Sequence, residues 1–134
     1  MAKVEASSTG GKITIDGTEC SLRERVFISP IATSGMGKTY PSLSSFSLIG
    51  VNETHYEKLV NLVLSGKLVS GSLEANDVDG DTSNKKYEFT KTRVLTADQD
   101  GQQPTSVYIS LDYGSLKYPF SSKPWEADDF NSRK

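Results

Sequence analysis

The segment ATSGMGKTY, residues 32–40, has the residue types of a phosphate-binding loop. A small residue is separated by four positions from Gly37, Lys38 and Thr39, the spacing with which backbone amides and a lysine bind nucleotide phosphates. Such a loop works where a buried strand leads into a helix whose N-terminus faces the phosphates. Here Pro41 and a serine-rich stretch follow, without helical periodicity. Nucleotide binding through Ala32–Thr39 is therefore a remote alternative, and we interpret the segment as a glycine-rich connection between two strands.

A second candidate site is the acidic loop that holds Asp77, Asp79 and Asp81 around Gly80. This alternation is similar to that of a calcium-binding loop, in which glycine takes the sixth position. With Gly80 in that position, the first ligand position falls on an alanine and the twelfth on a lysine. A solvated hairpin turn is the better interpretation.

Histidine and cysteine chemistry is limited by residue counts. His55 is the only histidine and Cys20 the only cysteine, so the sequence supplies no zinc cluster, histidine-based triad or internal disulfide. Cys20 is in phase with Leu22, which favours a small buried residue over a nucleophile. The sequence does not locate a paired set of buried carboxylates either. We therefore expect a protein that is not an enzyme and has no metal or cofactor.

The overall charge favours no anionic partner. The sequence has 15 lysines and arginines and 17 aspartates and glutamates, which gives a formal net charge of -2. No apolar run is long enough to cross a bilayer, and the first residues lack the apolar core of a secretory signal. We therefore expect cytoplasmic synthesis, no direct membrane insertion and no nucleic-acid partner.

Most of the chain has the alternating pattern of half-buried strands. Turn residues separate these segments, for example Asp16 and Gly17 between the first two. We predict strands over residues 12–15, 20–29, 43–49, 68–75, 86–97 and 106–118, the last three as an antiparallel meander. The 134 residues fit a single domain with irregular tails at 1–11 and 121–134, where Trp125 and Phe130 offer groups that can dock.

One helix is predicted between these strands. Thr54 and Glu57 have the spacing of a capping box, and Gly66 with Lys67 forms a typical C-terminal stop. The helix should therefore begin at about Glu53 or His55 and end at Ser65. Its apolar stripe is predicted to consist of Tyr56, Leu59, Val60, Val63 and Leu64.

A basic strand offers the main alternative function. Lys85, Lys86, Lys91 and Arg93 accompany Tyr87 and Phe89, a combination with which small β-barrels bind single-stranded nucleic acid. The two aromatic residues are also needed for a core, and we favour that use. A monomeric β-barrel binding module for nucleic acid or another ligand remains the alternative.

The order of these parts resembles the Hcp family, the tube protein of bacterial type VI secretion systems, which is related to phage tail tube proteins. The resemblance covers residues 20–120. It consists of a glycine-rich stretch at Gly35–Lys38, a strand with phenylalanine at Phe46–Ile49, a single helix within Glu53–Lys67 that ends in Gly-Lys, and a strand meander over Leu68–Phe120.

The resemblance implies a mainly β (α+β) fold, an antiparallel β-barrel of two packed sheets with one flanking α-helix. It implies a structural subunit that forms hexameric rings and stacks them into a tube, with Gly35, Gly37, Lys38 and Thr39 in the ring-stacking loop. The implied partners are other copies of the chain and the sheath, spike and effector proteins of the apparatus, with effectors carried in the lumen. Export would occur through the apparatus without a signal peptide.

Overall fold

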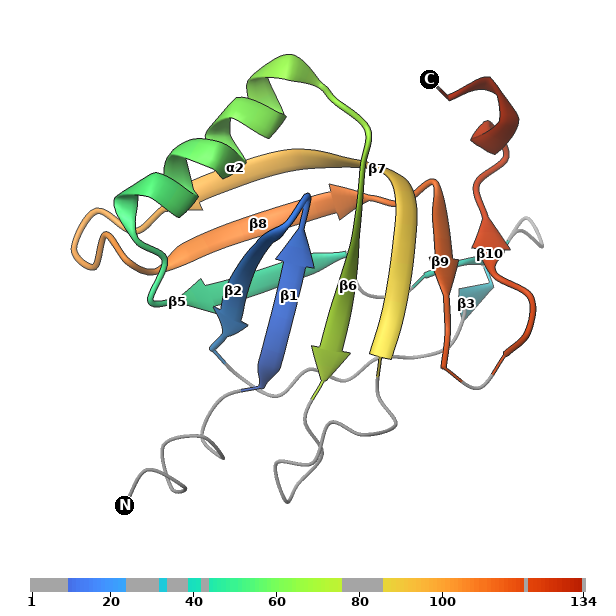
Figure 1. Cartoon of the computed structure of the whole chain (residues 1–134), viewed down its shortest axis with the longest axis horizontal. Helices are drawn as coiled ribbons and strands as arrows, with labels where there is room; N and C mark the ends of the chain where they lie inside the picture. Colours follow the sequence, from blue (N-terminus) through green and yellow to red (C-terminus); the bar gives the residue numbers. More distant parts are fainter. Residues whose placement is uncertain are drawn as a thin grey trace.

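A computed structural model describes residues 10–23, 32–33, 39–41, 44–75, 86–119 and 121–133 (Figure 1). These residues form ten strands, an α-helix and a 3-10 helix. The strands are β1 (Gly11–Ile15), β2 (Thr18–Leu22), β3 (Ala32–Thr33), β4 (Thr39–Tyr40), β5 (Ser45–Ile49), β6 (Val69–Ala75), β7 (Lys86–Gln99), β8 (Val107–Asp112), β9 (Ser115–Lys117) and β10 (Trp125–Glu126). The α-helix, α2, spans Glu53–Ser65, and the 3-10 helix, η1, spans Phe130–Ser132.

The main sheet closes on itself into an antiparallel barrel. Its strand order is β10-β9-β7-β6-β1-β2-β5-β8, and β7 also pairs with β8, which closes a ring of six strands. Strands β9 and β10 extend the sheet outside this ring, and β3 pairs with β4 in a separate hairpin. The expected mainly β barrel with a flanking helix is confirmed. The two sheets expected from the sequence are opposite sides of one closed sheet.

The strands β1, β2 and β6, here called the barrel wall, follow a regular alternation. Ile13 and Ile15 are fully buried, whereas the residues between and before them face outward. Asp16 and Gly17 both have positive φ, 49° and 84°, which suits the tight turn of a two-residue hairpin loop. Because the side-chain period of a strand is two, this turn fixes which face of both strands enters the core.

The helix has the predicted span but a different N-terminal cap. The Asn52 side chain accepts a hydrogen bond from the amide of His55 at 2.8 Å, so the capping box at Thr54 is wrong. Asparagine caps as well as threonine does, and it stands directly before the first helical residue. The predicted stop at Gly66 is confirmed, since this residue has φ 65° and its amide donates to the carbonyl of Leu62.

The buried face of α2 also differs in part from the prediction. Leu59 and Leu62 are buried, whereas the side chain of Leu64 is 79% exposed. Leu64 follows Leu59 by five residues and therefore lies well around the helix from it. Tyr56 and Val63 pack against the core as expected, and α2 lies along β7 (Figure 1).

Strand β7 changes partner along its length. Residues 88–90 pair with β9, and pairing with β8 begins at Arg93, opposite Asp112. Lys91 lies between the two paired parts with φ 48°, where the register with β6 also shifts. The single strand predicted over residues 106–118 is therefore wrong: it divides into β8 and β9 at Tyr113 and Gly114.

Gly114 makes this division possible. A Cβ atom at this position would lie 2.3 Å from the carbonyl oxygen of Lys91 and 2.7 Å from its Cβ. Only glycine allows the backbone to pass so close to β7. The chain thereby leaves β8 and returns along the first half of β7 as β9.

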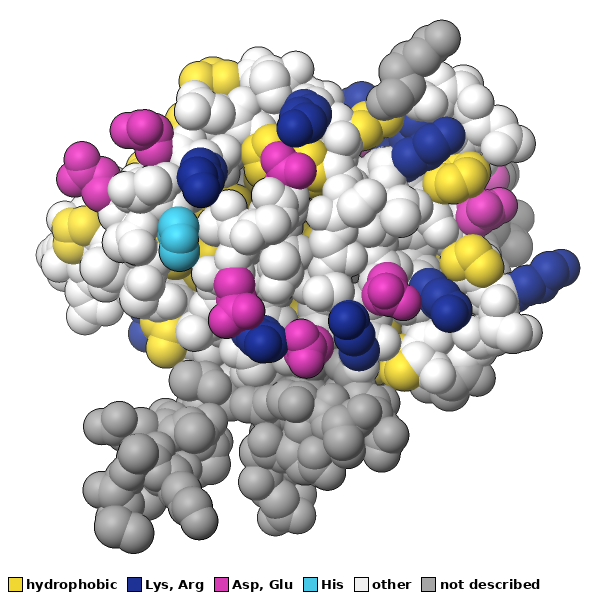
Figure 2. Space-filling view, viewed as in Figure 1, with side chains coloured by type: hydrophobic (Ala, Val, Ile, Leu, Met, Phe, Trp, Pro, Cys, Tyr) yellow, Lys and Arg dark blue, Asp and Glu magenta, His cyan; other side chains and the backbone are white. Residues whose placement is uncertain are grey.

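Charged residues alternate over the outer face of the barrel wall and the adjoining strands (Figure 2). The charge belt consists of Glu19, Lys12, Glu74, Lys86, Glu88 and Lys117. The Lys12 ammonium lies 3.4 Å from a carboxylate oxygen of Glu19 and 3.8 Å from one of Glu74. Glu74 is opposite Lys86, and Glu88 is opposite Lys117, in the strand register. Cross-strand pairs of opposite charge favour this register, although each exposed pair adds little stability.

Candidate functional site

The hairpin β3–β4 carries the candidate stacking loop. Thr33 pairs with Thr39 and Ala32 with Tyr40, so the two strands that flank residues 34–38 lie side by side. Of the loop residues singled out in the sequence, Thr39 is in β4, while Gly35, Gly37 and Lys38 lie outside the described residues. A phosphate-binding loop would place Thr39 in the first turn of a helix. Its position in a strand therefore contradicts the nucleotide-binding alternative.

Trp125 connects this hairpin to the barrel. Its indole Nε1 donates a hydrogen bond to the carbonyl oxygen of Thr39 at 3.1 Å. The indole is half-buried and packs against the core, and Trp125 is opposite Leu116 in the pairing of β10 with β9. The sequence indicated that Trp125 could dock the C-terminal segment. The structure adds that it also contacts the base of the candidate loop.

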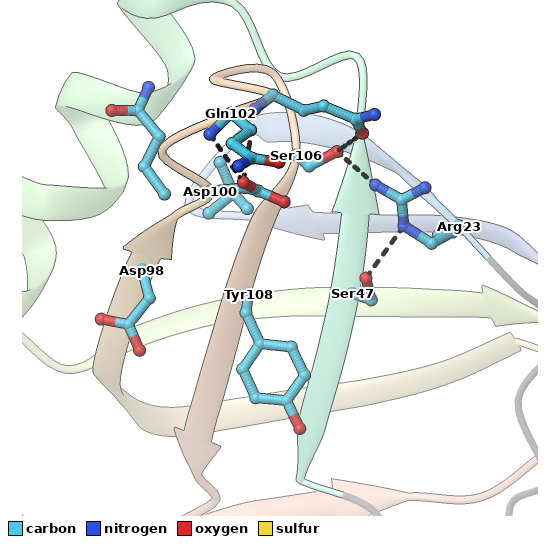
Figure 3. A pocket seen from close by; sticks show the side chains of 10 residues that line it. Arg23, Ser47, Asp98, Asp100, Gln102, Ser106 and Tyr108 are labelled. Carbon is cyan, nitrogen blue, oxygen red and sulfur yellow. Dashed lines mark hydrogen bonds between the residues drawn. The ribbon is translucent and has the colours of Figure 1, made fainter.

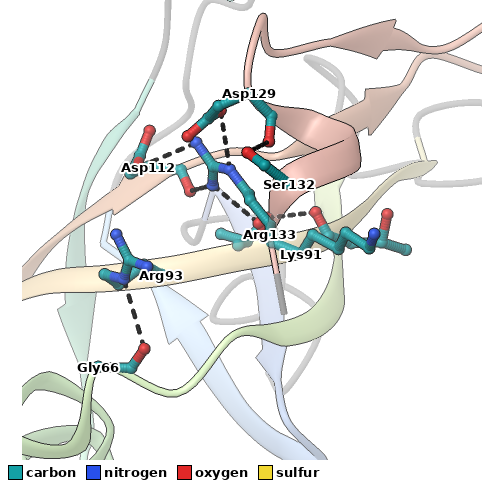
Figure 4. Close-up of polar contacts among 9 residues, drawn as sticks. Gly66, Lys91, Arg93, Asp112, Asp129, Ser132 and Arg133 are labelled. Atoms are coloured by element: carbon teal, nitrogen blue, oxygen red, sulfur yellow. Dashed lines mark hydrogen bonds and ion pairs between the residues drawn. The ribbon is translucent and has the colours of Figure 1, made fainter.

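The C-terminal segment, residues 121–133, is fixed at the point where β7 changes partner. The Arg133 guanidinium donates to the carbonyl of Lys91 at 2.9 Å and lies 3.2 Å from the Asp112 carboxylate and 3.0 Å from that of Asp129 (Figure 4). Its side chain is only 7% exposed. Lys91, Asp112, Gly114 and Arg133 are here called the β7 corner.

The aromatic ring of Phe130 completes the attachment of this segment. The Lys91 ammonium lies 4.7 Å from the ring centroid, and it also donates to the carbonyl of Phe130 at 3.4 Å. A cation over an aromatic face is attracted by the ring quadrupole. The segment expected to be an irregular tail thus contains a short strand and a 3-10 helix, both held against the barrel.

A polar hollow of about 530 Å³ lies beside the loop between β7 and β8 (Figure 3). The Arg23 side chain donates to Ser106 Oγ and to Ser47 Oγ, the latter at 3.3 Å. The Asp100 carboxylate accepts from the amides of Gln102 and Gln103, as aspartate commonly does in turns. The side chains of this hollow therefore hold the loop in place, and they do not form a nucleophile and base pair.

The remaining candidates for chemistry are inert or separated. Burial raises the pKa of the Cys20 thiol to about 11, and the neighbouring Glu19 carboxylate adds to the effect. The thiol is therefore protonated at neutral pH and a poor nucleophile. Among the described residues, no group of three histidine, cysteine or carboxylate side chains is placed to hold a metal ion. Asp77, Asp79 and Asp81 lie outside the described residues.

The basic strand does not form a stacking surface. Tyr87 and Phe89 are buried in the core, whereas Lys86 and Arg93 face outward. The aromatic rings that would stack on bases are therefore on the opposite face from the exposed cations. This arrangement removes the observation that supported single-strand nucleic-acid binding.

Arg133 and Gly114 are the residues of this region that the sequence analysis did not single out. Their partners are distant in sequence, and neither belongs to a local pattern. One signal in the sequence could have pointed to this region. Two large aromatic residues, Trp125 and Phe130, occur in a segment that lacks helix or strand periodicity. Such anchors indicate a docked segment even where no strand is predicted.

Similarity to known proteins is found in structure and not in sequence. Neither a protein-family model nor a curated protein sequence matches it. An Hcp protein of Salmonella typhimurium is 17% identical with a TM-score of 0.56, over 95% of this chain and 98% of that one. A mutant Hcp protein of E. coli EAEC 042 is 9% identical with a TM-score of 0.57, over 90% and 96%. A type VI secretion system effector from Yersinia pestis is 14% identical with a TM-score of 0.55, over 87% and 95%.

These matches cover most of both chains, and the chain therefore has the fold of Hcp proteins. The resemblance seen in the order of strands, loop and helix is confirmed at the level of the fold. In the described part of the chain, no helix has both the length and the apolar character needed to span a bilayer.

Proposed function

We propose that this chain is the ring-forming subunit of the inner tube of a type VI secretion-like apparatus. The observation that carries the proposal is the structural match to Hcp proteins over nearly the whole of both chains. The role is structural rather than catalytic. Arg23 and Asp100 hold the loop between β7 and β8, and Arg133 holds the C-terminal segment, which supports a structural use of these polar groups.

The fold suits assembly into a closed ring. Barrel closure pairs both edges of β1, β2, β5 and β6, so the terminal strand of the main sheet is the short β10. Short terminal strands limit open-ended pairing between copies. Contacts between subunits would then form through specific surfaces and close into a ring instead of growing into fibres.

Solution mass tests the proposal directly. A homohexamer of this 14.6 kDa chain should scatter light as a particle of about six times that mass, and negative-stain micrographs should show rings. A protein that stays monomeric at high concentration in both measurements would overturn the proposal.

We further propose that Gly35, Gly37, Lys38 and Thr39 belong to the loop through which rings stack. The pairing of β3 with β4 supports this role, since it brings both ends of the loop together at one place on the barrel. Replacing Lys38 by alanine should shorten stacks without changing the mass of the ring. Lys58→Ala, at an exposed position of α2, is the matched control.

The remaining partners follow from the same proposal. Sheath and spike proteins would contact the assembled tube, effectors would be carried in its lumen, and the subunit would leave the cell through the apparatus after cytoplasmic synthesis. Co-purification of the ring with proteins encoded beside it tests these contacts. Recovery of the subunit in the culture medium only when the apparatus is intact tests export.

A further inference from the structure

The hairpin β3–β4 needs an anchor outside itself. Two residues of each strand lie within the described part of the chain, and an isolated two-stranded sheet is marginally stable in water. Among the hydrogen bonds between described residues, the one from Trp125 Nε1 to the Thr39 carbonyl joins this hairpin to the rest of the chain. Trp125 thus ties β4 of the hairpin to β10 of the main sheet.

Trp125 is in turn held by a series of contacts that leads to the β7 corner. Strand β10 pairs with β9, and the amide of Ala127 donates to the carbonyl of Gly114 at 2.8 Å. Beyond η1, Arg133 binds the carbonyl of Lys91 and the carboxylate of Asp112. The segment is thus attached at both ends, with the indole at one end and the guanidinium at the other.

We infer that the C-terminal segment, residues 121–133, positions the β3–β4 hairpin for contact with a second ring of this protein, and that Trp125 is the positioning residue. The inference rests on the proposed function, because it explains what orients the hairpin that is proposed to contact the next ring. The segment acts through the hairpin and need not touch the second ring. Losing the indole donor should therefore weaken stacking and leave the ring itself intact.

The test replaces the indole donor in the full-length protein. Trp125→Phe removes the N–H group, and β-(3-benzothienyl)alanine at position 125 removes it while keeping the size of the ring system. Trp125 is the only tryptophan, so the analogue enters at this position alone. The matched control is Tyr108→Phe, which changes an aromatic residue that is 51% exposed on another strand.

The variants are compared by light scattering, by micrographs and by exchange of the indole proton. Light scattering should give the same ring mass for all variants, and micrographs should show shorter stacks for both changes at position 125. Loss of one hydrogen bond predicts ring–ring association that is roughly 2- to 10-fold weaker. In the unmodified protein, the single indole N–H proton should exchange with solvent more slowly than the indole proton of a short tryptophan peptide.

The outcomes separate this inference from the proposed function. If the unmodified protein forms no rings, the proposed function fails, and the exchange rate still tests the anchor. If rings form but the benzothienyl variant stacks as well as the unmodified protein, the inference is overturned. Rapid exchange of the indole proton would overturn it independently of any assembly.

Discussion

The barrel wall and the β7 corner are held together in different ways. In the wall, β1 pairs with β2 and β6 in unbroken register through a regular ladder. In the corner, β7 changes partner at Lys91, and a few groups distant in sequence satisfy the freed carbonyls. The wall thus tolerates change at most outward positions, whereas the corner depends on particular atoms of Gly114 and Arg133.

This difference matters for function because the corner supports the C-terminal segment. The wall presents the charge belt, in which each ion pair is solvated and replaceable. The corner presents a nearly buried guanidinium that binds the Lys91 carbonyl and two carboxylates at once, which its planar fork of donors allows. Substitutions at the two places should therefore separate general stability from the placement of the hairpin.

The largest effect is expected where the wall and the corner share a core residue. Phe89 is 1% exposed and lies opposite Gly71 of the wall, and its ring packs at a tilt with its centroid 5.7 Å from that of Tyr113 next to the corner. Phe89→Ala should lower the free energy of unfolding by about 3–5 kcal/mol, measured by urea denaturation. Leu64→Ala, at a 79% exposed position, should change it by less than about 0.5 kcal/mol. Similar midpoints for the two variants would contradict the packing described for β7.

Two glycines compare backbone crowding in the wall and the corner. A Cβ at Gly71 would lie 2.0 Å from the carbonyl oxygen of Thr14, and one at Gly114 would lie 2.3 Å from that of Lys91. Each change to alanine should cost about 1–3 kcal/mol of unfolding free energy, because backbone must move to admit it. Gly101→Ala has open space around it and serves as the control. If only the Gly71 change lowered the free energy of unfolding, the backbone at the corner would have to move more easily than its contacts indicate.

Loss of a charged side chain should affect the wall and the corner differently. Arg133→Ala should cost about 1–3 kcal/mol of unfolding free energy, since it leaves the Lys91 carbonyl and the Asp112 carboxylate without their donor. Lys12→Ala, in the charge belt, should cost less than about 1 kcal/mol. Arg133→Lys should recover only part of the loss, because an ammonium cannot bind these groups as a planar fork. Equal costs for Arg133→Ala and Lys12→Ala would refute the distinction.

The last effect is absent at neutral pH and appears only in alkali. Burial raises the pKa of Tyr113 well above its usual range, with Tyr118 adding to the effect, and burial together with Tyr87 raises the pKa of Tyr118 to about 12. Since the unfolded tyrosines ionise near pH 10, the folded state retains protons that the unfolded state has lost. The stability that these two tyrosines contribute should therefore be fully present below about pH 10 and be lost as the pH rises from about 10 to 12.

Absorbance near 295 nm measures this difference. Because the pKa values of Tyr113 and Tyr118 are raised in the folded protein, part of the absorbance change of the six tyrosines should appear only at higher pH or on unfolding. If the whole absorbance change occurred in one step near pH 10 while the protein remained folded, the burial of Tyr113 and Tyr118 would be contradicted.

Local patterns made the wall predictable. The alternation around Ile13 and Ile15, the turn at Asp16 and Gly17, and the helix stop at Gly66 each depend on neighbours in sequence. The predicted helix cap was wrong because two residues that can cap a helix, Asn52 and Thr54, lie within three positions. Asn52 is the one that accepts the hydrogen bond. Which residue caps the helix depends on which side chain can reach a free backbone amide in the first turn, and sequence spacing alone does not show this.

The corner and the candidate site depend on contacts between distant residues. No local pattern shows that Gly114 must pass over Lys91 or that Arg133 binds the same carbonyl. Around the candidate loop, the sequence argued against a helix at Thr39, while the short strand there and its hydrogen bond to Trp125 required the tertiary fold. Sequence reasoning therefore identified the elements of the site, and the structure showed how they are connected.

Barrel closure has a kinetic consequence. Strand β1 must find β6, and β5 must find β8, across long stretches of chain, as the pairs Ile13 with Leu73 and Ser45 with Ser110 show. Such non-local pairing slows folding to milliseconds or longer in domains of this kind. Until the last pair forms, the strands have open edges that another copy can bind. Refolding yield should therefore fall as protein concentration rises, even though the closed barrel protects those edges.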